Sequence, residues 1–314
     1  MNNSFSVIDN NQSKEKIERT ANIIFAICAF FAVFAVFSIS VYMIISGIPA
    51  LYEVGIKEIL FGTLWQPNAE VPSYGILYVI LTSVVGTLMA VLISVPIGVG
   101  TAIFLAYAAP KPLVSIVKPA IELLAAIPSV IYGLIGIIIL NPLMYKIELI
   151  LFADTPDHQY TGGSNLLSAV IVLAVMILPT VINISESALK SVPEKFADAS
   201  LALGATRIQT IFKVILPSAK SGIVTAIVLG VGRAVGEAMA ITMVAGNNAN
   251  LPLPFNSVRF LTTAVVAEMS YATDTHKRVL YTIGLILFAF IMIINLILNK
   301  VMKKGLKSGT KNSL

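Results

Sequence analysis

Long stretches of the chain contain no charged residue. Asp, Glu, Lys and Arg are absent from the ranges 21–52, 71–110, 123–145, 158–185, 238–258 and 279–299. A helix needs about 20 mostly apolar residues to cross about 30 Å of hydrocarbon, whereas strands of a membrane barrel are shorter and alternate in polarity. The pattern therefore predicts an all-α, polytopic membrane protein with six transmembrane helices, over 22–46, 76–106, 120–140, 166–184, 222–244 and 279–301.

Composition agrees with this assignment. Of the 314 residues, 57% are hydrophobic and 12% are charged, with a mean hydropathy of +0.90. A soluble domain carries about 25% charged residues, so a soluble enzyme is excluded on composition. The net charge of +5 is explained by the topology that follows and does not call for a nucleic-acid partner.

The basic residues are unevenly divided between the two sides of the predicted membrane. Fifteen Lys and Arg fall in alternate segments on one side, five fall on the other, and Arg233 lies inside a span. The positive-inside rule places the richer side in the cytoplasm, so both termini are expected there.

The predicted organisation has a core with two terminal extensions. We expect a loosely ordered polar leader over 1–20 and a first transmembrane helix with its outer loop over 21–75. A core domain of five transmembrane helices follows over 76–302, with a long cytoplasmic segment at 185–221, and a basic tail covers 303–314. Pro96 and Pro128 predict bends in the second and third spans.

The residues needed for common catalytic and metal sites are missing from the sequence. Cys28 is the single cysteine, so no intramolecular disulfide or cysteine-based metal site is possible. His158 and His276 are expected to be solvated loop histidines. No G-x-x-x-x-G-K-[ST] phosphate loop occurs, so the chain is predicted to be a non-enzymatic subunit.

The segment 185–221 has helix signals that a linker lacks. Pro193 is placed to begin one helix, Gly204 to end it, and Pro217 to stop a second. The second helix carries an apolar stripe at helical spacing, Ile208, Ile211, Phe212 and Ile215. Such a hairpin either docks a partner protein or packs on its own spans.

A motif in this segment favours docking. Asp198-Ala199-Ser200-x3-Gly204-x9-Val214-x-Leu216-Pro217 resembles the E-A-A-x3-G-x9-I-x-L-P motif of ABC importer permeases. The resemblance implies that Pro193, Asp198, Ala199, Gly204, Leu216 and Pro217 belong to a loop that couples to a separate ATPase chain. ATP and Mg would then be bound by that partner, and this chain would hold no cofactor.

Two further stretches narrow the family. Residues 118–133 and 228–240 resemble signatures of phosphate permeases of the PstC family, within a match from about Leu60 to the last span. The resemblance implies a type I importer fold and phosphate uptake across a prokaryotic cytoplasmic (inner) membrane. It also implies a homologous PstA-like permease half, two PstB-like ATPase subunits and an extracytoplasmic PstS-like phosphate-binding protein as partners.

Two ionisable residues in the fifth predicted span are candidates for the substrate pathway. Arg233 follows Gly222 by 11 residues, about 16 Å along a helix and so near mid-bilayer, and Glu237 lies one turn further on the same face. The arginine fork suits bidentate contact with an oxyanion, and Glu237 would hold it between turnovers. The alternative is a structural ion pair.

Three weaker candidates lie in the third predicted span. Glu122 is expected in its first turn, where an acid near Lys118 and a helix start is the simpler interpretation. Ser129 and Tyr132 are possible polar contacts to the anion or to water.

The sequence alone also allows functions other than phosphate import. The substrate could be sulfate, molybdate or tungstate, because an arginine contact does not distinguish these oxyanions. An ATP-independent secondary carrier and a membrane scaffold or sensor are the remaining alternatives.

Overall fold

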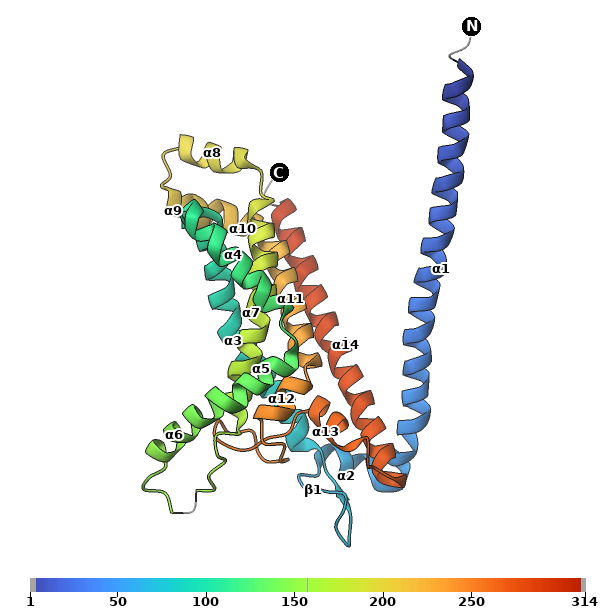
Figure 1. Ribbon diagram of the computed structural model, residues 1–314, viewed down its shortest axis with the longest axis vertical. Helices are drawn as coiled ribbons and strands as arrows, with labels where there is room; N and C mark the ends of the chain where they lie inside the picture. The colour runs from blue at the N-terminus through green and yellow to red at the C-terminus, as the bar shows by residue number, and fades with distance from the viewer. Residues whose placement is uncertain (1–3, 157, 312–314) are drawn as a thin grey trace.

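The computed structural model describes residues 4–156 and 158–311, and the side chains of 17–156, 158–297 and 300. It is a helical bundle with a small hairpin of helices at one end and loops with two short strands at the other (Figure 1). The predicted all-α class is confirmed. We call the end that carries α8 the hairpin end and the other the loop end.

Long helices form the body of the bundle. They are α3 (Leu77–Ile103), α7 (Leu166–Lys190), α11 (Lys220–Gly236) and α14 (Asp274–Lys311). A further long helix, α1 (Ser4–Ala50), lies beside this body. Within the described residues, five helical segments are long and apolar enough to cross a membrane, and α11 with the bent segment before it makes a sixth.

Shorter elements connect these helices. At the loop end lie α2 (Ile56–Phe61), β1 (Trp65–Gln66), β2 (Ser73–Tyr74), α6 (Asn141–Leu151), α12 (Met239–Val244) and α13 (Leu261–Glu268). The remaining short helices are α4 (Lys111–Ala126), α5 (Ser129–Ile135), α8 (Glu194–Ala202), α9 (Arg207–Thr210) and α10 (Leu216–Ser218). Single π-helical turns cover Leu51–Gly55, Phe104–Ala108, Gly136–Leu140 and Ile211–Ile215. The strands pair antiparallel, with Trp65 opposite Tyr74.

Helix α7 is the centre of the packing. Of its most apolar stretch, 61% is buried, the largest share among the membrane-spanning helices of the described chain. Glycines bring its neighbours close: a Cβ at Gly98 of α3 would lie 2.7 Å from Val181 Cγ1, and one at Gly230 of α11 would lie 2.8 Å from Ile177 Cγ2. Small residues allow this close approach between membrane helices.

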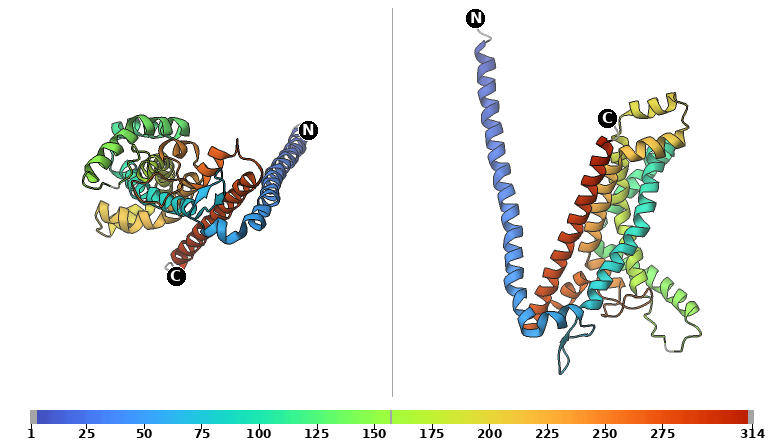
Figure 2. Two further views of the ribbon diagram at one scale, coloured as in Figure 1. Left: turned by 90° about the horizontal axis from the view of Figure 1, so that it is seen from below. Right: turned by 180° about the vertical axis from the view of Figure 1, so that it is seen from behind.

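Helix α1 stands apart from the bundle. It diverges from α14 toward the hairpin end and meets it near the loop end (Figure 2), and none of its most apolar stretch is buried. Near the loop end, Thr282 Oγ1 donates to the Gly47 carbonyl at 2.7 Å, and Arg278 pairs with Glu53. Helix α1 begins at Ser4 and so includes most of the predicted leader.

Two predicted spans are broken. The third, expected over 120–140, is interrupted at Ile127 and Pro128, so the span-length helix is Ser129–Leu151 and α4 is a separate helix toward the hairpin end (Figure 1). Proline lacks the N–H that a helix interior needs, which explains this break. The fifth, expected over 222–244, is interrupted at Glu237 and Ala238.

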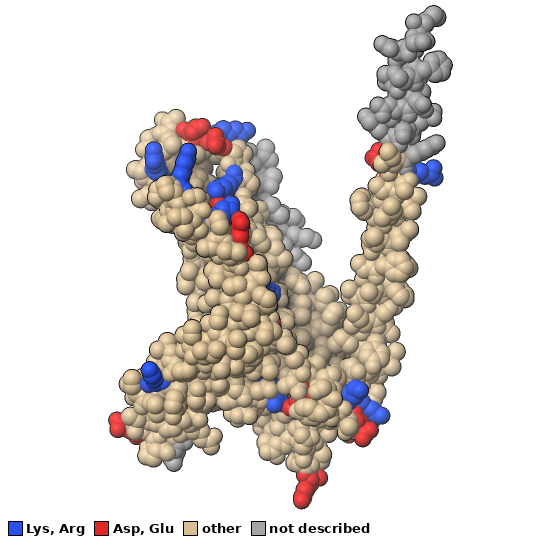
Figure 3. Space-filling view, in the orientation of Figure 1, with Lys and Arg blue, Asp and Glu red and all other residues tan. Residues whose placement is uncertain are grey.

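Charge on the molecule gathers at its two ends. Figure 3 shows Lys, Arg, Asp and Glu mostly over the hairpin end and the loop end, with an uncharged surface across most of the height between them. Such a band matches a hydrocarbon layer. The start of α1, the end of α14 and the hairpin lie at the same end of the molecule, as the predicted topology requires.

Candidate functional site

The first part of the site is the α8–α10 hairpin, residues 194–218. Helix α8 ends at Ala202 and is closed by Gly204, whose φ of +86° lies in the left-handed region that favours glycine. The Gly204 N–H donates to the Leu201 carbonyl at 2.9 Å, and the Ala205 N–H donates to the Ser200 carbonyl at 3.2 Å. This bond pair closes the helix in a Schellman motif. The predicted start near Pro193 and end at Gly204 are confirmed.

The second half of the hairpin runs back toward the membrane. Thr206 caps α9 by accepting the Gln209 N–H at 3.3 Å, and the Gln209 side chain accepts the Thr206 N–H at 2.9 Å. The helix ends at Ser218, one residue after the predicted stop at Pro217, and the chain turns by 67° at Ala219. One residue therefore separates the hairpin from α11.

The hairpin exposes an apolar surface. Leu203 is 90% exposed, and Ile208 and Phe212 from the predicted stripe are also exposed, whereas Ile215 is buried. A pocket of about 470 Å³ opens between the two arms, lined by Phe196, Ala199, Ser200, Leu203, Ala205, Gln209, Lys213 and Val214. Asp198 and Ala199 face solvent beside it. An exposed apolar surface of this kind is typical of a protein-docking site.

The second part of the site lies where α11 ends. Arg233 is half-buried in the last turn of α11, and among the described residues it has no hydrogen-bond or ion-pair partner. The expected one-turn spacing of Arg233 and Glu237 on a continuous helix is wrong, because α11 ends at Gly236. Glu237 instead accepts the Ala240 N–H at 3.0 Å and so caps α12, where a carboxylate is favourable.

Helix α5 supplies the facing wall. The Tyr132 hydroxyl donates to the Leu124 carbonyl of α4 at 2.6 Å, and Arg233 interacts electrostatically with the same tyrosine. A Cβ at Gly133 would lie 3.0 Å from Ala240 Cα, so α5 presses directly on α12. The structure thus brings Tyr132, Arg233 and Glu237 into one region.

The remaining candidates are placed differently. Ser129 is half-buried at the start of α5, and its side chain makes no hydrogen bond within the described chain. Glu122 is exposed in the fourth turn of α4, so the expected place in a first helical turn is wrong, although Lys118 lies one turn before it on the same helix. Lys118 instead pairs with Glu186 of α7 at 3.6 Å. The sequence analysis had not singled out Glu186.

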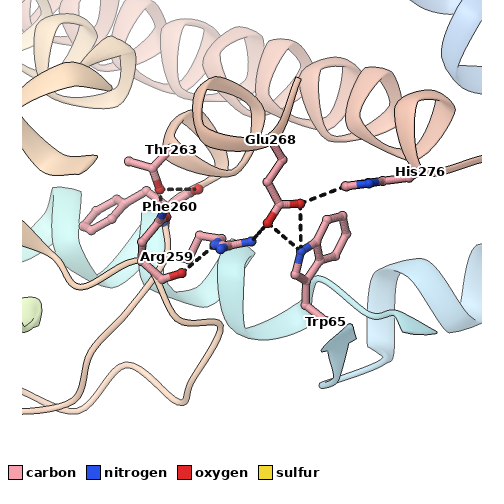
Figure 4. Close-up of polar contacts among 7 residues, drawn as sticks. Trp65, Arg259, Phe260, Thr263, Glu268 and His276 are labelled. Carbon is pink, nitrogen blue, oxygen red and sulfur yellow. Dashed lines mark hydrogen bonds and ion pairs between the residues drawn. The ribbon is translucent and has the colours of Figure 1, made fainter. Parts of the chain in front are cut away.

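Both histidines are paired with buried carboxylates, so the expectation of solvated loop histidines is wrong. His158 Nε2 lies 3.0 Å from Glu148 Oε1, and its ring stacks on Phe152 with centroids 3.8 Å apart. At the loop end, His276 Nε2 lies 2.8 Å from Glu268 Oε2 (Figure 4).

Glu268 is the centre of a polar cluster that joins three segments. Figure 4 shows Arg259, Trp65 and His276 converging on its carboxylate, and Trp65 Nε1 donates at 3.2 Å to each oxygen. Burial, followed by the Glu268 charge, raises the pKa of the neighbouring Tyr271 hydroxyl. These contacts tie Trp65, Arg259 and His276 to one carboxylate, which gives the cluster the character of a structural brace. The described residues contain no group of three potential metal ligands.

Comparison with known proteins identifies the family. Residues 94–308 match the family described as the binding-protein-dependent transport system inner membrane component, and the chain belongs to this family of multi-pass membrane proteins.

Curated relatives cover most of the chain. It is 37% identical over 303 residues to the probable ABC transporter permease protein YqgH of Bacillus subtilis, covering 94% of this chain and 95% of that protein. It is 39% identical over 236 residues to the phosphate transport system permease protein PstC of Pasteurella multocida (71% and 72%) and 34% identical over 272 residues to PstC of Haemophilus influenzae (81% and 86%). The resemblance to phosphate permeases seen in the sequence is confirmed, and the chain is an ABC importer permease.

Solved structures share the fold. A bacterial alginate ABC transporter, crystallised with an alginate-bound periplasmic protein, superposes with a TM-score of 0.60 at 15% identity, covering 92% of this chain and 96% of that chain. The MetNI methionine ABC transporter gives 0.55 at 20% identity, covering 73% and 95%. Both likenesses support the type I importer permease fold.

Proposed function

We propose that this chain is one permease half of an ATP-driven importer of inorganic phosphate. The observation that carries the proposal is an arginine in a membrane span with no ion-pair partner among the described residues, in a chain 39% identical to a phosphate permease. An unpaired cation in a span is costly, about 2.5–3.5 kcal/mol on insertion scales, and such residues mark substrate pathways. A bound oxyanion would supply the missing partner.

The partners follow from the same family. A second, homologous permease half would complete the pathway, and two ATPase subunits would dock at the α8–α10 hairpins in the cytoplasm. A phosphate-binding protein would deliver the anion at the loop end. ATP and Mg belong to the ATPase, and both termini of this chain lie in the cytoplasm.

The residues of the pathway have distinct tasks in this scheme. Arg233 offers a planar fork that can donate two parallel hydrogen bonds to a phosphate. Glu237 holds the break between α11 and α12 through its bond to Ala240, and its charge limits how tightly an anion is kept. Tyr132 braces α5 against α4, with Ser129 and Glu122 as secondary polar positions.

The test is uptake of radiolabelled phosphate into proteoliposomes that contain the full complex with its binding protein. Arg233→Gln should lower uptake roughly ten- to hundredfold, since a hydrogen bond to a charged group contributes about 1.5–3 kcal/mol. The uptake rate of Arg233→Lys should lie between those of the unaltered complex and Arg233→Gln, because lysine keeps the positive charge but lacks the planar guanidinium fork.

A matched control removes a cation from the same helix. Lys220 is exposed at the hairpin end of α11, so Lys220→Gln should transport at the normal rate. Excess sulfate should leave phosphate uptake unchanged. ATP hydrolysis without phosphate flux in the unaltered complex, or equal suppression by sulfate, would contradict the phosphate assignment and leave the importer class in place.

A further inference from the structure

A buried carboxylate joins α4 to the hairpin end of α7. Glu186 is 2% exposed, and its Oε1 lies 2.6 Å from Lys190 Nζ of the same helix and 3.6 Å from Lys118 Nζ of α4. The two lysine side chains are 47% and 42% exposed. A buried charge requires a partner, and here one partner is local while the other comes from a different helix.

The α8–α10 hairpin has a direct chain connection to only part of the candidate pathway. Its start follows α7, which ends at Lys190, and its other end enters α11, which carries Arg233, after the turn at Ala219. Helix α5, the facing wall, lies far from the hairpin in sequence. Movement of the hairpin therefore reaches α5 through packing and hydrogen-bond contacts with other helices.

Contacts of α4 complete such a route. Beyond Lys118, the same helix accepts the Tyr132 hydroxyl at the Leu124 carbonyl, 2.6 Å away. Next to Tyr132, Gly133 packs on Ala240, whose N–H is bonded to the Glu237 carboxylate at 3.0 Å. The contacts are contiguous from Lys190 at the base of the hairpin to Glu237 in the pathway.

We propose that the Lys118–Glu186 ion pair is a coupling contact, which transmits movement of the ATPase-docking hairpin through α4 to α5, the wall of the pathway that faces Arg233. Arg233 moves with the hairpin through the chain itself, and the ion pair lets the opposite wall move in step. The inference rests on the proposed function, because it assigns a driven movement to the same site. Lys118 and Glu186 are positioning residues and touch no substrate.

Lys118→Gln is the decisive variant. It removes the link between the helices while Glu186 keeps Lys190, so no buried charge is left unpaired. Lys111→Gln, at the exposed first position of α4, is the matched control. Lys118→Arg should keep an ion pair with Glu186. The measurement is phosphate transported per ATP hydrolysed in the reconstituted complex.

We expect Lys118→Gln to hydrolyse ATP near the normal rate and to carry at least threefold less phosphate per ATP. Lys111→Gln and Lys118→Arg should keep the normal ratio. An unchanged ratio in Lys118→Gln would overturn the coupling role, whereas absence of phosphate flux in the unaltered complex would count against the proposed substrate instead.

A second measurement, the rate of thiol labelling, does not depend on the identity of the substrate. Ser129→Cys at the start of α5, in a chain with Cys28→Ser, reports movement of that wall through the rate of thiol labelling. Binding of ATP with vanadate should change this rate, and Lys118→Gln should abolish the change. A nucleotide response that persists in Lys118→Gln, or that is missing even with Lys118 present, would refute the proposal.

Discussion

Replacing Gly204 by alanine tests whether the hairpin docks a partner through its present shape. The φ of +86° places this residue in the left-handed region, and a Cβ there would meet no atom within 4 Å. The cost is therefore one of backbone conformation without a steric clash, about 1–2 kcal/mol for a residue with a Cβ. If the ATPase requires the Schellman turn, its affinity for the permease falls by a factor of about 5–30.

The assay is equilibrium binding of the purified ATPase subunit to the permease pair in nanodiscs. Gly162→Ala is the matched control: its φ of +65° and empty surroundings impose a similar backbone cost, but it lies on a loop after α6. Gly204→Asn should bind better than Gly204→Ala, since asparagine tolerates the left-handed region. Equal ATPase affinity for Gly204→Ala and the unaltered chain would show that the turn geometry does not matter for docking.

Three further outcomes are expected. Glu268→Gln should lower the unfolding free energy by about 3–5 kcal/mol, because it leaves a buried arginine unpaired; Glu53→Gln, at a half-exposed pair, should cost at most about 1 kcal/mol. Thermal unfolding of the purified chain compares the two, and similar melting points would contradict the burial argument. Leu203→Ser should weaken ATPase binding without lowering the melting temperature, since the side chain is 90% exposed; a loss of folded protein would refute this. Gly98→Val should destabilise by about 1–3 kcal/mol through overpacking against α7, whereas Gly100→Val meets open space and should retain its packing; equal losses would argue against the close contact.

The sequence predicted the membrane spans because it records length and charge directly. A helix that crosses hydrocarbon excludes charge for about 20 residues, and five of the six charge-free stretches overlap a span-length helix in the structure. The exception, 238–258, forms the short helix α12 and the loop after it. The turn at Gly204 could also be predicted from the sequence, since few residues other than glycine adopt a positive φ.

The exact positions of the helix breaks and the partners of the buried carboxylates could not be predicted from the sequence. Pro128 predicted a bend, yet the apolar residues on both sides allow the span to begin before or after it. Glu237 has the spacing of a helical ion pair with Arg233, and competition from the free N–H groups of α12 decided its position. Glu268 meets Trp65 across 203 residues of sequence, and no local pattern records such a contact.

The isolation of α1 has a consequence for how the protein is made. Its side chains meet those of α14, as where Tyr42 and Tyr281 lie 3.1 Å apart through their hydroxyls, 239 residues apart in the chain. Synthesis runs from the N-terminus, so the first helix enters the membrane long before the last exists. During translation α1 must remain as a single helix in lipid, which its apolar surface permits. Joining α1 to α14 is then a closing step of biogenesis, and a nascent chain stalled before α14 would hold its first helix undocked.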